Sequence, residues 1–166
     1  NLSSVAMAHY ILEVAGVPPA APITFLDEAL VTKPDYLSLM TLIGLKFLVP
    51  DRLSIPHEPP YLYQGWSGTT TKLWGRGFGY REVLPVSWRT EPPPFKKAPP
   101  TFPVSKSGWL IVGSITRNWD AAQEMLQVFD PSQTIWIHGE DCGPTLYERT
   151  RLSERVGNVF VRELQT

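Results

Sequence analysis

The first 60 residues alternate between apolar stretches with helical spacing and breaks that contain proline or glycine. Ser3 or Ser4 can cap an opening helix, and Gly16 with the prolines that follow it ends that helix. Residues 24–31 open like a capping box with aspartate in the acidic role, which predicts a short helix. A third helix is expected over 34–48, and because it is apolar on nearly every side we expect it to be buried or to bind a partner.

The pattern changes from helical spacing to strand-like runs in residues 61–91. Two runs rich in β-branched and aromatic residues, 69–74 and 80–84, flank a stretch with three glycines, which predicts a β-hairpin. Residues 61–90 carry four basic side chains and one acidic side chain, so this region has a local excess of positive charge. The sequence therefore predicts a basic hairpin that is rich in aromatic residues.

Basic residues interleaved with aromatic residues are the combination that binds single-stranded nucleic acid, because rings stack on bases and cations follow phosphates. Two other interpretations of the hairpin stay open. The rings can pack on a half-exposed sheet, and Trp, Tyr and Arg are also common where proteins bind one another. The candidate nucleic-acid contacts are Lys72, Trp74, Arg76, Phe78, Tyr80 and Arg81.

A proline-rich stretch separates these elements from the rest of the chain. The 17 prolines are about twice the average usage of roughly 5%. Each proline removes a backbone donor and restricts the residue before it, so their concentration at 92–104 predicts an extended connector. We therefore expect a helical region (1–60), a hairpin (61–91), this connector and an α/β unit (105–166).

Short apolar runs and helical patterns alternate in the C-terminal unit. The runs at 108–113, 134–137 and 158–161 are typical of strands buried on both faces. A helix is expected in each interval between them, the first capped by Asn118 or Thr116. Right-handed crossovers make this a Rossmann-like parallel β-α-β-α-β unit, so the fold class is α+β overall. Three strands make a small sheet, and we expect them to pair with strands of the first half or of another chain.

Ligands of open parallel sheets bind beyond the carboxyl ends of the strands, where loops and helix N-termini present backbone N–H groups. Two loops of the predicted unit lie there. The first offers a glycine, hydroxyl groups and an arginine, and the second offers glycines, a histidine and two carboxylates. This predicts a crevice that binds a phosphate-bearing ligand, a nucleotide or a nucleotide-derived molecule. The candidate ligand-binding residues are Gly113, Ser114, Thr116, Arg117, His138, Gly139 and Gly143.

The Gly-Ser pair of the first loop and the His-Gly pair of the second resemble the SLOG superfamily of Rossmann-like nucleotide-binding domains, in particular its YspA-type branch. The resemblance covers about residues 108–164 and implies a nucleotide or nucleotide-derived ligand. Glu140 and Asp141 stand where that branch has glycine and alanine. Its Ala-Asp pair is replaced by Pro144 and Thr145, so the acid usually placed on the ligand is missing. The Pro-Gly-Gly-x-Gly-Thr motif of the phosphoribohydrolase branch is absent, which argues against that hydrolysis.

Cys142 and His138 are candidate catalytic residues within the second loop. A thiol at a helix N-terminus is more readily ionised and can act as a nucleophile. An incidental role for the cysteine stays open, because a Cys-His pair usually takes its base from a distant segment. No metal is predicted, since the spacing of His138, Asp141 and Cys142 suggests no fourth ligand. The sequence leaves open whether the chain is an enzyme, and it predicts no cofactor other than a nucleotide ligand.

The composition excludes several further classes of protein. The formal net charge of -1 argues against a polyanion binder held by global charge, and the single cysteine excludes an internal disulfide. The longest apolar run is interrupted by polar residues and no signal peptide is visible, so we expect no membrane contact and an intracellular, cytoplasmic location. The chain begins with Asn1, which favours a fragment or a processed product.

A second kind of function stays open beside ligand binding. The chain can be a non-enzymatic structural or interaction protein, a processed piece of a larger assembly or polyprotein. In that case the α/β unit is a scaffold, and the basic hairpin contacts single-stranded nucleic acid or a protein partner. A homo-oligomer is a further expectation, because it would extend the small sheet.

Overall fold

The computed structural model describes residues 3–89, 108–139 and 158–161. Three predictions lie outside these residues: the connector at 92–104, the second helix of the α/β unit, and the positions of Cys142 and Gly143. Within the described residues, no helix combines the length and the apolar character needed to cross a membrane.

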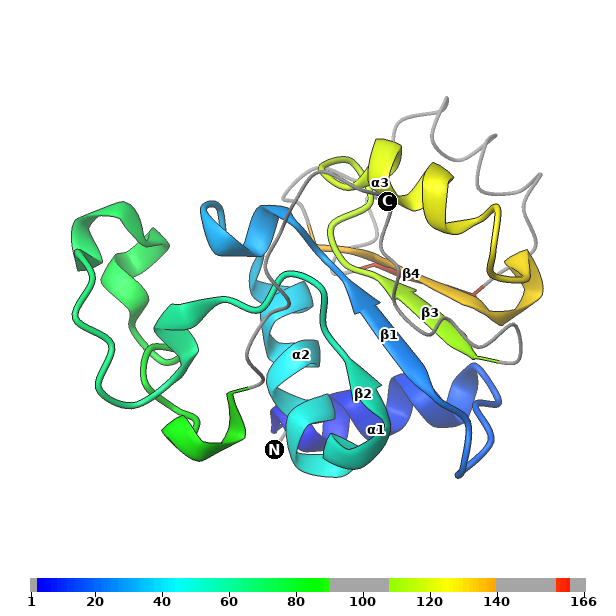
Figure 1. Ribbon diagram of the computed structural model, residues 1–166, viewed down its shortest axis with the longest axis horizontal. Coiled ribbons are helices and arrows are strands. Elements are labelled where there is room, and N and C mark those ends of the chain that lie inside the picture. The colour runs from blue at the N-terminus through cyan, green and yellow to red at the C-terminus, as the bar shows by residue number, and fades with distance from the viewer. Residues whose placement is uncertain (1–2, 90–107, 140–157, 162–166) are drawn as a thin grey trace.

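The fold is built on one sheet of five parallel strands in the order β2-β1-β3-β4-β5 (Figure 1). The predicted strands of the C-terminal unit are present, which confirms a small parallel α/β unit. The expectation that they pair with strands of the first half is also confirmed, since β1 pairs with β3. The strands are β1 (Ile23–Leu26), β2 (Leu53–Ser54), β3 (Trp109–Val112), β4 (Thr134–His138) and β5 (Asn158–Val161).

Helices cover both faces of this sheet. The α1 helix (Ser4–Val14) and the α2 helix (Tyr36–Leu48) pack together with Phe25 and Ile111 on one face. The α3 helix (Trp119–Met125) packs with alternate residues of the same strands on the other face. Because successive side chains of a strand point to opposite faces, a strand between two helical layers is apolar throughout.

The two N-terminal helices form as the sequence predicts. Ser3 accepts a hydrogen bond from the backbone N–H of Ala6 at 3.2 Å and so caps α1. Asp35 caps α2 by accepting from the N–H of Ser38 at 2.8 Å. A Cβ at Gly44 would overlap the backbone of α1, so this glycine allows the close approach of the two helices. The apolar α2 helix is therefore buried, as expected.

The predicted helix at 24–31 is wrong. Ile23–Leu26 is a strand that pairs with β2 on one side and β3 on the other. Only a short 3₁₀ helix, Ala29–Val31, remains of the prediction, and Asp27 accepts a hydrogen bond from the N–H of Leu30 at 3.2 Å. The apolar run before the aspartate gains more from burial between two strands than a one-turn helix can offer.

The predicted β-hairpin is also wrong. The first arm (69–74) contains the 3₁₀ turn Thr70–Lys72, the glycine stretch contains a second one, Trp74–Gly77, and the second arm (80–84) contains a turn and an isolated bridge but no strand. Gly75, Arg76 and Gly77 all have positive φ, which interrupts extended backbone. The pairing that does form is a single parallel bridge between Tyr63 and Leu84. The second arm therefore pairs with residues 61–64 rather than with the first arm, and aromatic residues favour strands only where a partner strand lies beside them.

Candidate functional site

The carboxyl edge of the sheet brings the starts of both predicted loops together. Ile115 donates its N–H to the Ile137 carbonyl at 3.1 Å, so the chain after β3 lies against the end of β4. Four of the predicted ligand-binding residues are buried at this edge: Gly113, Ser114, His138 and Gly139. The order of the strands reverses between β1 and β3, which is the position where ligands bind in sheets of this kind.

A carboxylate that the sequence analysis assigned to a helix cap occupies this position. Asp27 follows β1 and is only 1% exposed. Its Oδ2 accepts from the Ser38 hydroxyl at 2.5 Å, and its Oδ1 accepts from Asn118 Nδ2 at 2.8 Å. Burial raises the pKa of Asp27 to about 6, although these two donors act in the opposite direction, and the Asp35 carboxylate raises it further.

Asn118 closes the space between the loops that follow β1 and β3. Besides its bond to Asp27, it accepts from the Glu28 N–H at 2.8 Å and donates to the carbonyls of Gly113 and Ser114. The sequence analysis placed Asn118 at the start of a helix, where it does stand, but its side chain makes no capping bond. It braces two loops across the point where the strand order reverses.

Gly113 and Gly139 were predicted to lie beside a bound phosphate. In the structure they lie beside side chains of the protein itself. A Cβ at Gly113 would overlap the Ser38 hydroxyl and the Asp27 carboxylate, and a Cβ at Gly139 would overlap the Asp35 carboxylate. Buried carboxylates repel an anion in a medium of low dielectric constant. Among the described residues, acidic and polar side chains of the chain itself therefore occupy the space beside Gly113 and Gly139, and phosphate binding at this edge stays a prediction.

The remaining predicted residues of this loop lie on the surface. Thr116 and Arg117 are both exposed. The Arg117 guanidinium donates to the Lys33 carbonyl at 2.7 Å, which joins the loop after β3 to the segment after β1. This outer part of the edge is the part that a ligand can reach.

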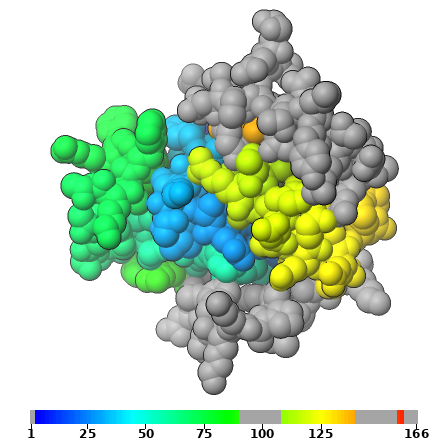
Figure 2. All heavy atoms as spheres, turned by 90° about the horizontal axis from the view of Figure 1, so that it is seen from above, coloured from blue at the N-terminus to red at the C-terminus, as the bar shows by residue number. Residues whose placement is uncertain are grey.

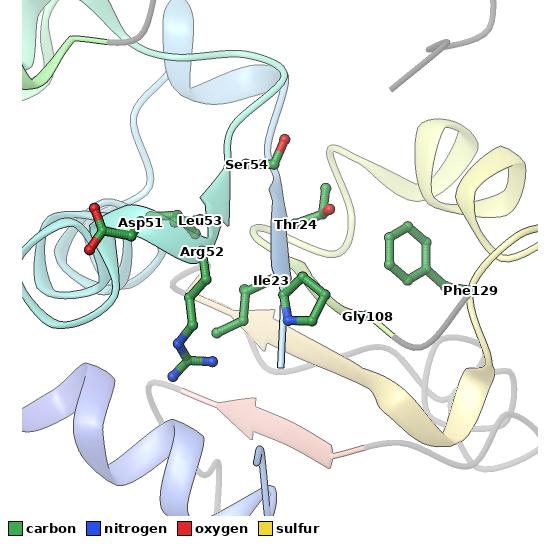
Figure 3. Close-up of a pocket in the computed structure, with 9 residues that line it drawn as sticks. Ile23, Thr24, Asp51, Arg52, Leu53, Ser54, Gly108 and Phe129 are labelled. Atoms are coloured by element: carbon green, nitrogen blue, oxygen red, sulfur yellow. The ribbon is translucent and has the colours of Figure 1, made fainter. Parts of the chain in front are cut away.

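The cavity drawn in Figure 3 lies at the opposite end of the sheet. Its volume is about 250 Å³, and it is lined by the hydroxyls of Thr24 and Ser54 and by the Phe129 ring. Arg52 also borders it, but its guanidinium donates to the Ala21 carbonyl at 2.5 Å. The volume is below the usual range of ligand pockets, and the predicted site residues are not among those that line it.

Residues 61–89, which we call the basic lobe, form a body of turns beside α2 (Figure 1). Its buried residues extend the hydrophobic core of α1 and α2 and include Tyr61 and Tyr80, whose rings lie edge to face with centroids 5.6 Å apart. The Tyr61 hydroxyl donates to the Leu30 carbonyl at 2.5 Å, and the Tyr80 hydroxyl donates to the Trp74 carbonyl at 2.6 Å. Phenol groups therefore fix both the attachment of the lobe and the turn that carries Trp74.

A buried ion pair beneath the basic lobe anchors it to α2 through hydrogen bonds to Trp88 and Tyr63. Lys46 Nζ lies 2.5 Å from Glu58 Oε1 and donates to the Trp88 carbonyl at 2.9 Å. The Tyr63 hydroxyl donates to the same carboxylate oxygen, and together with burial this contact raises the Tyr63 pKa well above its usual range. This cluster was not predicted from the sequence, although Lys46 is the one charged residue in the largely apolar stretch Tyr36–Leu48.

Five of the six candidate nucleic-acid contacts stand at the surface of the lobe. Trp74 is 78% exposed and Phe78 is 90% exposed, so these rings do not pack on a sheet, and that interpretation is wrong for them. Lys72, Arg76 and Arg81 are exposed as well. Tyr80 is the exception, because its ring is buried in the core of the lobe and has no face for a base.

Over the ranges that the structure describes, no group of three or more metal-ligating side chains comes together. Comparison with models of protein families, with curated proteins and with solved structures finds no match to this chain. The resemblance of the two loops to the SLOG superfamily stays a prediction from the sequence.

Proposed function

We propose that the protein binds single-stranded nucleic acid through the surface of the basic lobe. The observation that carries this proposal is the exposure of two large aromatic rings, Trp74 and Phe78, on a loop with Lys72 and Arg76. Exposed rings next to cations suit a chain of stacked bases joined by phosphates.

The backbone of the loop supports the presentation of these rings. Gly75 and Arg76 both have φ of 55°, a left-handed conformation that only glycine adopts without strain. The strain at Arg76 is balanced by the fixed turn around it, where Arg76 donates its N–H to the Leu73 carbonyl at 2.9 Å. Leu73 is buried while its neighbour Trp74 projects into solvent, so the turn is anchored on one side and open on the other.

Charge favours a nucleic acid over a protein partner. The acidic side chain of the lobe, Glu82, lies 3.1 Å from Arg81 Nε, so it is paired within the lobe. The other three basic residues between positions 61 and 90, Lys72, Arg76 and Arg89, leave an excess of positive charge that attracts phosphates. A protein partner would have to supply acidic groups as well as apolar surface. Binding of such a partner is the alternative outcome of the experiment below.

The test is fluorescence anisotropy of labelled single-stranded RNA and DNA of mixed sequence, measured over a range of salt concentrations. We expect the double variant W74A/F78A to lose tenfold or more in affinity, because stacking contributes roughly 1–3 kcal/mol per base. K72A/R76A should reduce the salt dependence by about 0.7 in log–log slope for each phosphate that the variant no longer neutralises. Tyr36→Ala is the matched control, since Tyr36 is an exposed ring outside the lobe.

Two results would overturn the proposal. The first is wild-type affinity in W74A/F78A, because it would show that binding occurs elsewhere. The second is the absence of salt-dependent binding to either RNA or DNA by the wild-type protein. If acidic peptides are bound instead and that binding requires Trp74 and Phe78, the lobe is a protein-binding surface.

A further inference from the structure

Tyr80 is the buried member of the six candidate nucleic-acid contacts, and its hydroxyl reaches the loop that carries the exposed rings. The residue is only 3% exposed, and its hydroxyl donates to the Trp74 carbonyl at 2.6 Å. Burial raises the pKa of Tyr80, so the phenol keeps the proton that it donates. This hydrogen bond therefore joins the hydrophobic core to the backbone of a residue whose own ring projects into solvent.

The Tyr80 ring is itself held by its neighbours. It lies edge to face with the Tyr61 ring, with centroids 5.6 Å apart, and both rings belong to the core that α1 and α2 share. The Tyr61 hydroxyl donates to the Leu30 carbonyl at 2.5 Å, and Figure 2 shows the green lobe beside the blue segment that contains Leu30. Packing against the body of the protein therefore fixes the direction in which the Tyr80 hydroxyl points.

The turn that carries Trp74 folds back closely on itself. Phe78 donates its N–H to the Gly75 carbonyl at 3.1 Å, which brings the second exposed ring back over the turn. A Cβ at Gly77 would lie 3.2 Å from Cδ1 of the buried Leu73, which is tighter than ordinary van der Waals contact. These contacts close the turn, and the hydrogen bond to the Trp74 carbonyl attaches the closed turn to the core.

We infer that Tyr80 is a positioning residue, whose hydroxyl holds the backbone of the turn so that the Trp74 ring is already in place for a base before binding. This inference rests on the proposed function of the basic lobe. Ordering a mobile group on binding costs affinity, and a turn that is fixed in the free protein avoids part of that cost. Tyr80, which the sequence analysis predicted as a direct contact, thus acts through Trp74 and touches no base itself.

The experiment removes the hydroxyl and keeps the ring. Affinity for labelled single-stranded RNA and DNA is measured by anisotropy for the wild-type protein, for Y80F, for W74A and for W74A/Y80F. Tyr61→Phe is the matched control, because it removes a hydroxyl from the same core whose acceptor, the Leu30 carbonyl, lies outside the loop. Thermal unfolding verifies that each variant is folded.

We expect Y80F to lose about two- to tenfold in affinity, the size of effect that ordering one large side chain has on binding. Y61F should bind as the wild-type protein does. In the W74A background, loss of the Tyr80 hydroxyl should change the affinity no further, because the ring that it positions is gone. Wild-type affinity in Y80F, or an equal loss with and without Trp74, would overturn the inference while leaving binding by the lobe intact.

Nuclear magnetic resonance relaxation of the free protein supplies a second readout, which does not depend on nucleic acid. The backbone amides of Trp74 and Gly75 should have order parameters of about 0.85 in the wild-type protein and clearly lower values in Y80F. Values below about 0.6 in the wild-type protein, or equal values in the two proteins, would show that the hydroxyl does not fix the turn. Failure of the wild-type protein to bind any oligonucleotide would instead overturn the proposed function, and the role of Tyr80 in it.

Discussion

Glycines have opposite effects at the carboxyl edge of the sheet and in the basic lobe. At the edge, Gly113 and Gly139 leave room for the carboxylates of Asp27 and Asp35, and the space is closed. In the lobe, Gly75 and Gly77 turn the chain so that Trp74 and Phe78 project into solvent. A glycine-rich stretch between predicted elements therefore does not by itself indicate a ligand site, because it can equally admit the protein's own side chains.

The two regions also differ in how they hold charge. The edge keeps its acids buried and hydrogen-bonded to neutral donors such as Ser38 and Asn118. The lobe rests on the buried ion pair of Lys46 and Glu58, and its own cations Lys72, Arg76, Arg81 and Arg89 are exposed. We therefore expect substitutions at the edge and at the base of the lobe to change stability, and substitutions at the tip of the lobe to change binding only.

The largest effect should come from Lys46→Met. The substitution removes the cation but leaves the Glu58 carboxylate buried at the base of the lobe, which costs about 3–5 kcal/mol in the free energy of unfolding. Urea unfolding at neutral pH measures this loss. The double variant K46M/E58Q should recover much of it, since no unpaired charge is then buried. A single variant as stable as the wild-type protein would show that the ion pair does not anchor the lobe.

The next effect concerns pH and the Asp27 carboxyl. Burial raises its pKa to about 6 from 3.8, so the folded state binds a proton in a pH range where the unfolded chain has released it. The stability due to this group is complete below about pH 4 and is lost as the pH rises through 6, a total of about 3 kcal/mol. Asp27→Asn should abolish this fall.

The measurement for Asp27 is the difference in unfolding free energy between the wild-type protein and D27N from pH 4 to pH 8. Taking the difference removes the contribution of His57, which titrates in both proteins and whose pKa burial lowers. Parallel stability curves for the two proteins would contradict the burial of an ionisable group at this edge. The matched variant Asp130→Asn changes an exposed carboxyl and should leave the curve between pH 5 and pH 8 unchanged.

Much of the fold could be predicted from the sequence because local signals and burial agree there. Ser3 caps α1, and the apolar runs after the proline-rich stretch form β3 and β4 as expected. The failure at β1 has a physical cause. Four residues before an aspartate fit either a strand or a helix start, and only the strands on both sides, from positions far along the chain, decide between them.

The candidate sites were predictable to different degrees. The positions where the two loops begin, at the carboxyl ends of β3 and β4, were placed correctly, since parallel strands direct their ends to one side. What fills that edge could not be predicted, because Ser38 and Asn118 reach Asp27 from positions 11 and 91 residues away. In the lobe, the composition identified the exposed rings, but it could not separate the buried Tyr80 from the exposed Trp74 and Phe78.

A smaller effect is expected from Gly113→Ala, which tests whether the edge is filled. The added methyl group would overlap the Ser38 hydroxyl, and overpacking of this kind costs roughly 1–3 kcal/mol. A double-mutant cycle with Ser38→Ala, followed by thermal unfolding, should give a favourable coupling energy because the second change removes the overlapping atom. If Gly113 faced an open crevice, the methyl group would be tolerated and the coupling would be zero.

The smallest effect on stability, and the sharpest contrast with the edge, is expected from Phe78→Ala. A ring that is 90% exposed loses almost no burial when it is truncated, so the free energy of unfolding should change by less than about 0.5 kcal/mol. The same variant should weaken binding to single-stranded RNA several-fold in anisotropy titrations, because it removes one stacking surface. The neighbouring Leu73 is a buried anchor of the same loop. Leu73→Ala should therefore lower the free energy of unfolding by roughly 2–5 kcal/mol. A destabilised F78A variant would mean that the ring packs against the protein in solution. The lobe would then be filled by its own side chains, as the carboxyl edge is.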